Sequence, residues 1–126
     1  MSASGIVVHG IANCDTVKKA RAWLTAEGLA YDFHDFKRDG VSAALLDAWI
    51  AAVGVQTLVN RKGTTWRRLD DATRAAIGDP AAARAVLLAQ PSLVKRPVVR
   101  WPDGSFSVGL DALRAVGARH GAVSAG

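Results

Sequence analysis

The N-terminal third of the chain follows a strand–helix–strand order, which constrains the fold more than any other feature. A short β-rich run at residues 6–9 precedes apolar residues that recur at helical spacing from Val17 to Leu24, with Gly28 as the stop. The segment YDFHDF, residues 31–36, then alternates as a strand does. Three such elements within about thirty residues predict a βαβ unit, whose parallel strands are joined by a right-handed crossover.

The middle of the chain has a helical pattern instead. Ser42 is placed to cap a helix that stops at Gly54, and residues 57–69 are predicted as a loop. The segment DDATRAAIG reads as a short helix, and a further helix begins with Asp79 at the N-cap and Pro80 at its first position. We therefore expect residues 42–90 to form a helical insertion between the two halves of a sheet.

The C-terminal part supplies the second half of that sheet. VVRW and SFSV are separated by the turn signal PDG, which predicts an antiparallel strand pair. A last helix is expected over residues 110–116. The fold class is thus α/β, with a mixed four-stranded sheet. A chain of 126 residues is expected to form a single domain over residues 1–126, with flexible tails at about 1–4 and 117–126.

Composition excludes several classes of protein. No apolar run approaches the ~18 residues of a membrane span, and the N-terminus lacks the pattern of a signal peptide. A single cysteine cannot form an internal disulfide, so a reducing cytoplasm is the expected location. The formal charge is +5, but the basic residues are scattered in short pairs such as Arg61–Lys62 and Lys95–Arg96. This distribution favours an anionic small molecule and not nucleic acid as the ligand.

The single cysteine, Cys14, lies where the first helix is predicted to begin, with Asn13 as the expected N-cap. The unpaired N–H groups and the helix dipole at such a position favour thiolate over thiol. The alternative is a small buried hydrophobic residue, since free cysteines are often buried. The strand–turn–cysteine–helix placement favours a functional thiol. His9, His34 and His120 have no metal-site spacing, so no metal is expected.

Three segments carry a resemblance to a known family: GIANCDTVKKARAWL, NRKGTTWR and QPSLVKRPVV. Together they resemble the ArsC-like family, and within it the YffB-type reductases, which are related to arsenate reductases and to Spx regulators. The resemblance implies a thioredoxin-like fold and makes Cys14 the nucleophile. It implies that Arg61 and Arg96 bind an anion. Asn13 is expected to act with them in binding the anion or glutathione. It also implies that Pro97 follows a cis peptide bond and faces the cysteine.

The sequence departs from this family's pattern at three positions. The place of the second cysteine in a C-x-x-C pair holds Val17. Arsenate reductases of this type have a histidine four residues before the cysteine, where this chain has Gly10. They also have a third arginine after the last strand, where this chain has Gly109. Two groups that handle the oxyanion are therefore missing.

The resemblance implies a glutathione-dependent thiol/disulfide reductase with no bound cofactor. Glutathione would be the co-substrate, a small disulfide or oxyanion the substrate, and glutaredoxin a further partner. Three alternatives stay open. The chain could be a true arsenate reductase, an Spx-like regulator that binds RNA polymerase, or a thioredoxin-fold protein that has lost its chemistry. Trp66, which lies in the basic segment, could form a wall of the pocket or serve in packing alone.

Overall fold

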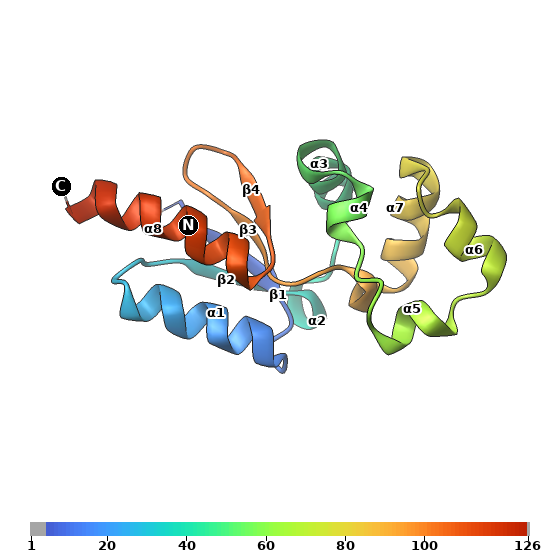
Figure 1. The fold of residues 1–126 in the computed structure, drawn as a ribbon, viewed down its shortest axis with the longest axis horizontal. Helices are drawn as coiled ribbons and strands as arrows, with labels where there is room; N and C mark the ends of the chain where they lie inside the picture. Colours follow the sequence, from blue (N-terminus) through green and yellow to red (C-terminus); the bar gives the residue numbers. More distant parts are fainter. Residues whose placement is uncertain (1–4, 126) are drawn as a thin grey trace. The chain divides into compact units, whose positions relative to one another are not determined.

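A computed structural model describes the backbone of residues 5–125 and the side chains of residues 5–120 (Figure 1). The contacts within the chain group it into two compact units. One unit is Met1–Asp39 with Arg96–Gly126, and the other is Gly40–Lys95. The second unit covers the insertion expected at residues 42–90. Each unit is described below by itself.

The first unit contains a four-stranded sheet in the order β2-β1-β3-β4, over the part of the chain described. Its strands are β1 (Val7–Gly10), β2 (Asp32–Asp35), β3 (Val98–Arg100) and β4 (Phe106–Val108). Strand β1 pairs in parallel with β2 and antiparallel with β3, and β3 pairs antiparallel with β4. The sheet is mixed, which confirms the predicted α/β class, and both halves lie at the positions that the sequence pattern indicates.

Two helices cover one face of this sheet: α1 (Asp15–Ala26) and α8 (Leu110–Ala125), which lie against each other (Figure 1). A third, α2 (Phe36–Asp39), directly follows β2. One buried cluster joins α1 and α8 to alternate positions of the strands, as expected for a sheet with one face covered. Its members are Ile6, Val8, Ala20, Leu24, Leu29, Val99, Trp101 and Leu113. Tyr31 and Phe33 pack against the same cluster, as the alternation in YDFHDF indicates.

Helix α8 is longer than the sequence pattern predicts. The sequence pattern predicts a helix over residues 110–116, whereas the structure continues it to Ala125. A Cβ on residue 117 would lie 2.5 Å from Cζ3 of Trp23 and 3.3 Å from Cη2 of Trp101. The glycine therefore admits two indole rings close to the helix axis. Farther along, the ring of His120 stacks on Trp101 with 5.0 Å between centroids.

The second unit is helical. It comprises α3 (Ala43–Val53), α4 (Val55–Leu58), α5 (Thr64–Arg68), α6 (Asp71–Ala76), α7 (Pro80–Ala89) and a short 3₁₀ helix, η1 (Pro91–Leu93). The predicted caps are confirmed. Ser42 Oγ accepts a hydrogen bond from the N–H of Leu45, and Asp79 accepts one from Ala82. Fully buried side chains from four of these elements form its interior: Leu46, Trp49, Leu58, Leu87 and Leu93.

The segment predicted as a loop, residues 57–69, contains the end of α4 and all of α5. Helix α5 begins after Gly63 with no side-chain cap, so the sequence gives no start signal for it. Its C-terminal end is held by a residue of the next helix. Arg74 donates to the carbonyl oxygens of Arg67 at 3.2 Å and Leu69 at 2.6 Å, and forms an ion pair with Asp71. Tertiary contacts thus stabilise a helix that local signals do not indicate.

Candidate functional site

The residues around Cys14 gather at one edge of the sheet in the first unit. In the register, His9 lies opposite Val98, and Gly10 lies beside Asp35. Because β1 is parallel to β2 and antiparallel to β3, the chain leaves β1 and enters β3 at the same edge. Cys14 follows the end of β1, and Arg96 and Pro97 precede the start of β3. The structure therefore brings the predicted nucleophile and two of its predicted partners to this edge.

Cys14 is itself the N-cap residue of α1. Its backbone is extended, with φ −134° and ψ 124°, and its carbonyl oxygen accepts the first helical hydrogen bond, from Lys18 N–H at 2.9 Å. The prediction that Asn13 is the N-cap is wrong. Asn13 lies in the preceding turn and is exposed. The thiol is partly exposed and makes no capping hydrogen bond, so it stands at the end of the helix where backbone N–H groups lack helical partners.

The Arg96–Pro97 peptide bond is cis, as predicted. Pro97 is buried and Arg96 is partly exposed. Two hydrogen bonds hold the segment at Pro97 and Val98, one from the side of β4 and one from β1. The N–H of Gly109, just after β4, donates to the carbonyl oxygen of Pro97 at 2.9 Å. The carbonyl oxygen of Val98 lies 2.9 Å from Nδ1 of His9, on β1. The segment that carries Arg96 is thus fixed to the strands on either side.

His9 serves this edge as a structural residue. The residue is 4% exposed, and burial lowers its pKa from 6.5 to about 4. The imidazole is therefore neutral at pH 7, with the proton on Nδ1 to donate to Val98. Its ring centroid lies 5.1 Å from that of His34, the residue beside it on β2. Over the described residues no three His, Cys, Asp or Glu side chains group as metal ligands.

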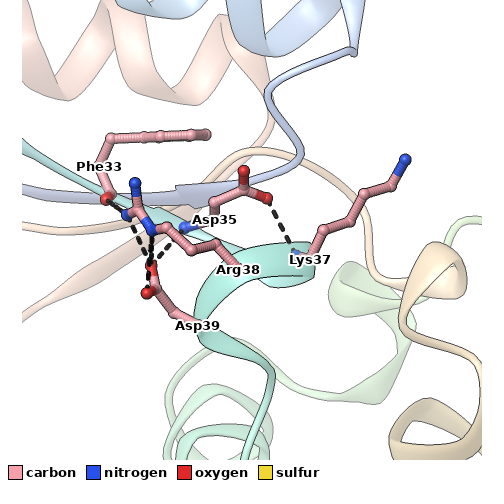
Figure 2. Close-up of polar contacts among 5 residues, drawn as sticks. All are labelled: Phe33, Asp35, Lys37, Arg38 and Asp39. Atoms are coloured by element: carbon pink, nitrogen blue, oxygen red, sulfur yellow. Dashed lines mark hydrogen bonds and ion pairs between the residues drawn. The ribbon is translucent and has the colours of Figure 1, made fainter.

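A charged cluster closes the end of β2 at the same edge (Figure 2). Arg38 forms a two-pronged ion pair with Asp39 and also donates to the carbonyl oxygen of Phe33 at 3.0 Å. Asp39 accepts from the N–H of Asp35, whose own carboxylate accepts from Lys37 N–H. The hydrogen bond from Arg38 lowers the pKa of Asp39 to about 2. These charges compensate one another, so the cluster stabilises the turn into α2. The sequence interpretation did not single it out.

Arg61 belongs to the second unit. Its Nη1 donates to Gln56 Oε1 at 3.1 Å, and its guanidinium carbon lies 5.4 Å from the ring centroid of Trp66. Trp66 therefore packs against the side chain of Arg61. The sequence interpretation noted Lys62 and Lys95 only as members of basic pairs. The structure places both beside Arg61, around one small cavity.

A model of the ArsC family matches residues 9–113, which include Cys14 and both arginines. The chain belongs to the ArsC family. A solved YffB protein is 48% identical, with a TM-score of 0.79 over 87% of this chain and 96% of that one. A solved arsenate reductase-related protein from Brucella melitensis is 47% identical, with a TM-score of 0.72 over 85% and 88%. An uncharacterized protein of Haemophilus influenzae is 39% identical over 84% of this chain and 91% of its own.

These similarities confirm the thioredoxin-like α/β fold that the resemblance implies for this ArsC-family chain. They cover the sheet, the cysteine loop and the helical insertion together, since each spans more than four fifths of the chain. No helix within the described part of this ArsC-family chain has both the length and the apolar character that crossing a membrane requires.

Proposed function

We propose that this ArsC-family chain is a glutathione-dependent thiol–disulfide reductase of the cytoplasm, with Cys14 as its only nucleophile. The observation that carries the proposal is the position of Cys14. Cys14 is partly exposed and occupies the N-cap position of α1, at the sheet edge where Arg96 and Pro97 also lie. Helix N-termini and neighbouring cations are the environments in which cysteines act as nucleophiles.

The reaction runs in two thiol–disulfide exchanges. The Cys14 thiolate attacks the glutathione sulfur of a mixed disulfide, the substrate S–S bond breaks, and the substrate leaves as a thiolate that takes up a proton. Cys14 is then disulfide-bonded to glutathione. A second glutathione thiolate attacks the glutathione sulfur of that adduct, releasing oxidised glutathione and regenerating the Cys14 thiolate. In net terms, one mixed disulfide and one glutathione thiol become one substrate thiol and one molecule of oxidised glutathione, and no bound cofactor takes part.

The remaining residues of the edge have supporting roles in this proposal. Arg96 supplies a permanent positive charge that attracts an anionic thiol to this edge. Asn13, exposed in the turn before Cys14, offers an amide to the incoming peptide. Val17 is completely buried at the position of a resolving cysteine, so the resolving thiol must come from solution. Glutaredoxin is a second candidate for that resolving step.

Arsenate reduction is the second candidate function. It is favoured by the 47% identity to the arsenate reductase-related protein from Brucella melitensis. In that case the same thiolate would attack arsenate, with Arg96, on the same unit, as an anion-binding group. The chain has Gly109 where the resemblance implies a third arginine, so we place this activity second.

A turnover assay tests the proposal. The substrate is the mixed disulfide of glutathione and 2-mercaptoethanol, with glutathione as reductant and oxidised glutathione as the measured product. We expect the wild type to accelerate the exchange well above the uncatalysed rate and Cys14→Ser to abolish the acceleration. Ser92→Ala, a change of an exposed hydroxyl in the helical unit, is the matched control and should retain activity. Equal rates for wild type and Cys14→Ser would reject the proposal.

A further inference from the structure

Helix α7 of the helical unit is apolar on its exposed side as well as on its buried side. Its ten residues, PAAARAVLLA, include one charged residue, Arg84, which donates to Asp47 Oδ2 on α3 at 3.1 Å. On the buried side, Ala83 and Leu87 are completely covered. The exposed side consists of Ala81, Ala85, Leu88 and Ala89. A helix that is apolar all round is normally covered on every side, so the exposed side of α7 lacks a cover that its composition favours.

Leu88 is the residue that makes this exposed side unusual. It is 39% exposed, and it is the one exposed large hydrophobic residue in the part of the chain that the structure describes. It lies three positions after Ala85 and seven after Ala81, so the three residues share one side of the helix. Single apolar residues are common on protein surfaces, whereas a contiguous apolar surface marks a site of contact.

A groove continues this apolar surface beyond α7. Its volume is about 410 Å³, and all of its lining belongs to the helical unit. The lining residues are Arg68, Leu69, Asp70, Thr73, Ala85, Val86, Ala89 and Gln90. Ala85 and Ala89 thus belong both to the exposed side of α7 and to the groove. The two features form one surface, on which apolar side chains of a partner can be buried.

Two opposite charges lie in the groove beside the apolar surface. Arg68 is exposed and forms no ion pair with another residue of the described chain. Asp70 is also exposed, and its carboxylate accepts from Thr73 N–H at 2.7 Å as the N-cap of α6. These hydrogen bonds to Thr73 lower the pKa of Asp70, so it is ionised at neutral pH. The surface therefore offers one cation and one anion to a partner.

We propose that this surface binds the same surface of a second copy of this chain about a twofold axis. We name it the α7 patch and define it by Arg68, Asp70, Ala85, Leu88 and Ala89. A twofold axis places a patch on its own copy, so the patch must be complementary to itself. With the two α7 helices antiparallel, Leu88 of each copy packs beside that of the other, and Arg68 of each copy faces Asp70 of the other.

The charges favour a second copy over a partner of another kind. An acidic partner would place a negative charge against Asp70, and a basic partner would place a positive charge against Arg68. The twofold arrangement pairs both residues and leaves the apolar side chains in the centre of the contact, as in stable interfaces. Cys14 does not belong to the α7 patch, so this proposal does not depend on the proposed function.

Sedimentation velocity of the Cys14→Ser protein tests the proposal, because a disulfide-linked dimer cannot form. Over a series from about 10 μM to about 1 mM, we expect the average mass to rise reversibly from that of one chain towards that of two. Leu88→Glu places a charge in the apolar centre and should raise the dissociation constant about tenfold or more. Ala75→Glu adds the same charge at an exposed position of α6 outside the α7 patch, and as the matched control it should have no such effect.

A second pair of variants tests the charges. Arg68→Glu places a glutamate against Asp70 of the second copy and should weaken the dimer by about threefold or more. Asp70→Asn in the same protein should recover part of the loss, because the repulsion is removed while asparagine keeps the N-cap. Arg67→Glu is the matched control, since Arg67 is exposed but does not line the groove.

Three results would overturn the proposal. The first is a monomer at every concentration. The second is a dimer that is as stable in Leu88→Glu or Arg68→Glu as in the parent protein, because the contact would then lie elsewhere. The third is a mass that grows beyond that of two chains, because a twofold contact closes on itself. Circular dichroism of each variant establishes that a change in mass does not come from unfolding.

Discussion

Val17 packs directly against Gly10, and this contact links two of the departures from the family pattern. A Cβ on residue 10 would lie only 2.8 Å from Cγ2 of Val17, which is completely buried. Residue 10 is the position of a histidine in the arsenate reductases that the chain resembles, and residue 17 is the position of a resolving cysteine in C-x-x-C proteins. The absence of a side chain at residue 10 therefore makes room for the valine at residue 17. This valine leaves Cys14 without a thiol partner in the chain.

The Gly10–Val17 contact should appear as an energetic coupling. Gly10→Ala should destabilise the fold by about 1–3 kcal/mol, because the buried valine has little room to move. In Val17→Ala protein the same change should cost at least about 0.5 kcal/mol less, since the clashing methyl groups are gone. Urea denaturation of the wild type, both single variants and the double variant gives the coupling. Strictly additive effects would contradict the contact.

Gly117 should also resist substitution, although it lies inside a helix. Alanine is a better helix former by about 1 kcal/mol, but its Cβ would lie 2.5 Å from Trp23. We expect Gly117→Ala to lower the free energy of unfolding by about 1–2 kcal/mol. Gly78→Ala is the matched control, because a Cβ there meets nothing within 4 Å, and it should be neutral or stabilising by up to about 1 kcal/mol. A stabilised Gly117→Ala would show that the indole rings lie elsewhere.

His9 should make stability depend on pH between about 6.5 and 4. Its pKa is lowered from 6.5 to about 4, mainly by burial, with smaller contributions from His34 and Arg100. In this window the unfolded chain binds a proton that the folded chain does not, so stability is lost as the pH falls from 6.5 to 4. The full loss is about 3 kcal/mol. Unfolding curves at several pH values measure it.

His9→Gln, which keeps an N–H donor but does not titrate, should flatten this part of the pH profile. The carboxyls of Asp39, Asp70 and Asp103 also have lowered pKa values, because of their hydrogen bonds to Arg38, Thr73 and Ser105 respectively. Their contribution is lost from about pH 5 downward, as the pH approaches the unfolded value of 3.8, so the part of the slope between pH 6.5 and about 5 belongs to His9. An unchanged slope in His9→Gln would assign the pH dependence to another group.

Arsenate should be a poor substrate. A missing charge-assisted hydrogen bond of about 1.5–3 kcal/mol corresponds to about a ten- to hundredfold loss in anion affinity or rate. Gly109→Arg would restore the third guanidinium, but residue 109 has φ +94°, which side chains disfavour. Gly109→Ala is therefore the matched control, since it carries the same backbone strain without the charge. Arsenate reduction is measured with glutathione and glutaredoxin present. Efficient turnover by the wild type would contradict this prediction.

The sequence predicted those parts of the fold that depend on local signals. Ser42 and Asp79 each cap a helix at the position where the pattern starts it, and the turn PDG joins two strands. Local signals did not predict the helices whose presence or length depends on contacts with other elements. Helix α5 is held by Arg74 from the next helix, and α8 passes through Gly117 because two tryptophans need the space.

The candidate site was predictable to a similar extent. The family resemblance identified Cys14, Arg96 and the cis bond before Pro97, and the register of β1 and β3 brings these residues to one edge. Lys95 could not be assigned to the cavity from the sequence, because it reaches Arg61 through a backbone bridge between distant segments. The role of His9 depends on its burial and on a contact with Val98, which spacing does not show.

Intact-mass measurement after exposure to oxidised glutathione is the most direct test of Cys14 as a single nucleophile. We expect the wild type to gain the mass of one glutathione and excess thiol to remove it. Cys14→Ser should gain nothing. Because Val17 occupies the second cysteine position, the adduct should persist until an external thiol arrives. A wild type that gains no adduct, under conditions where iodoacetamide alkylates Cys14, would contradict the account.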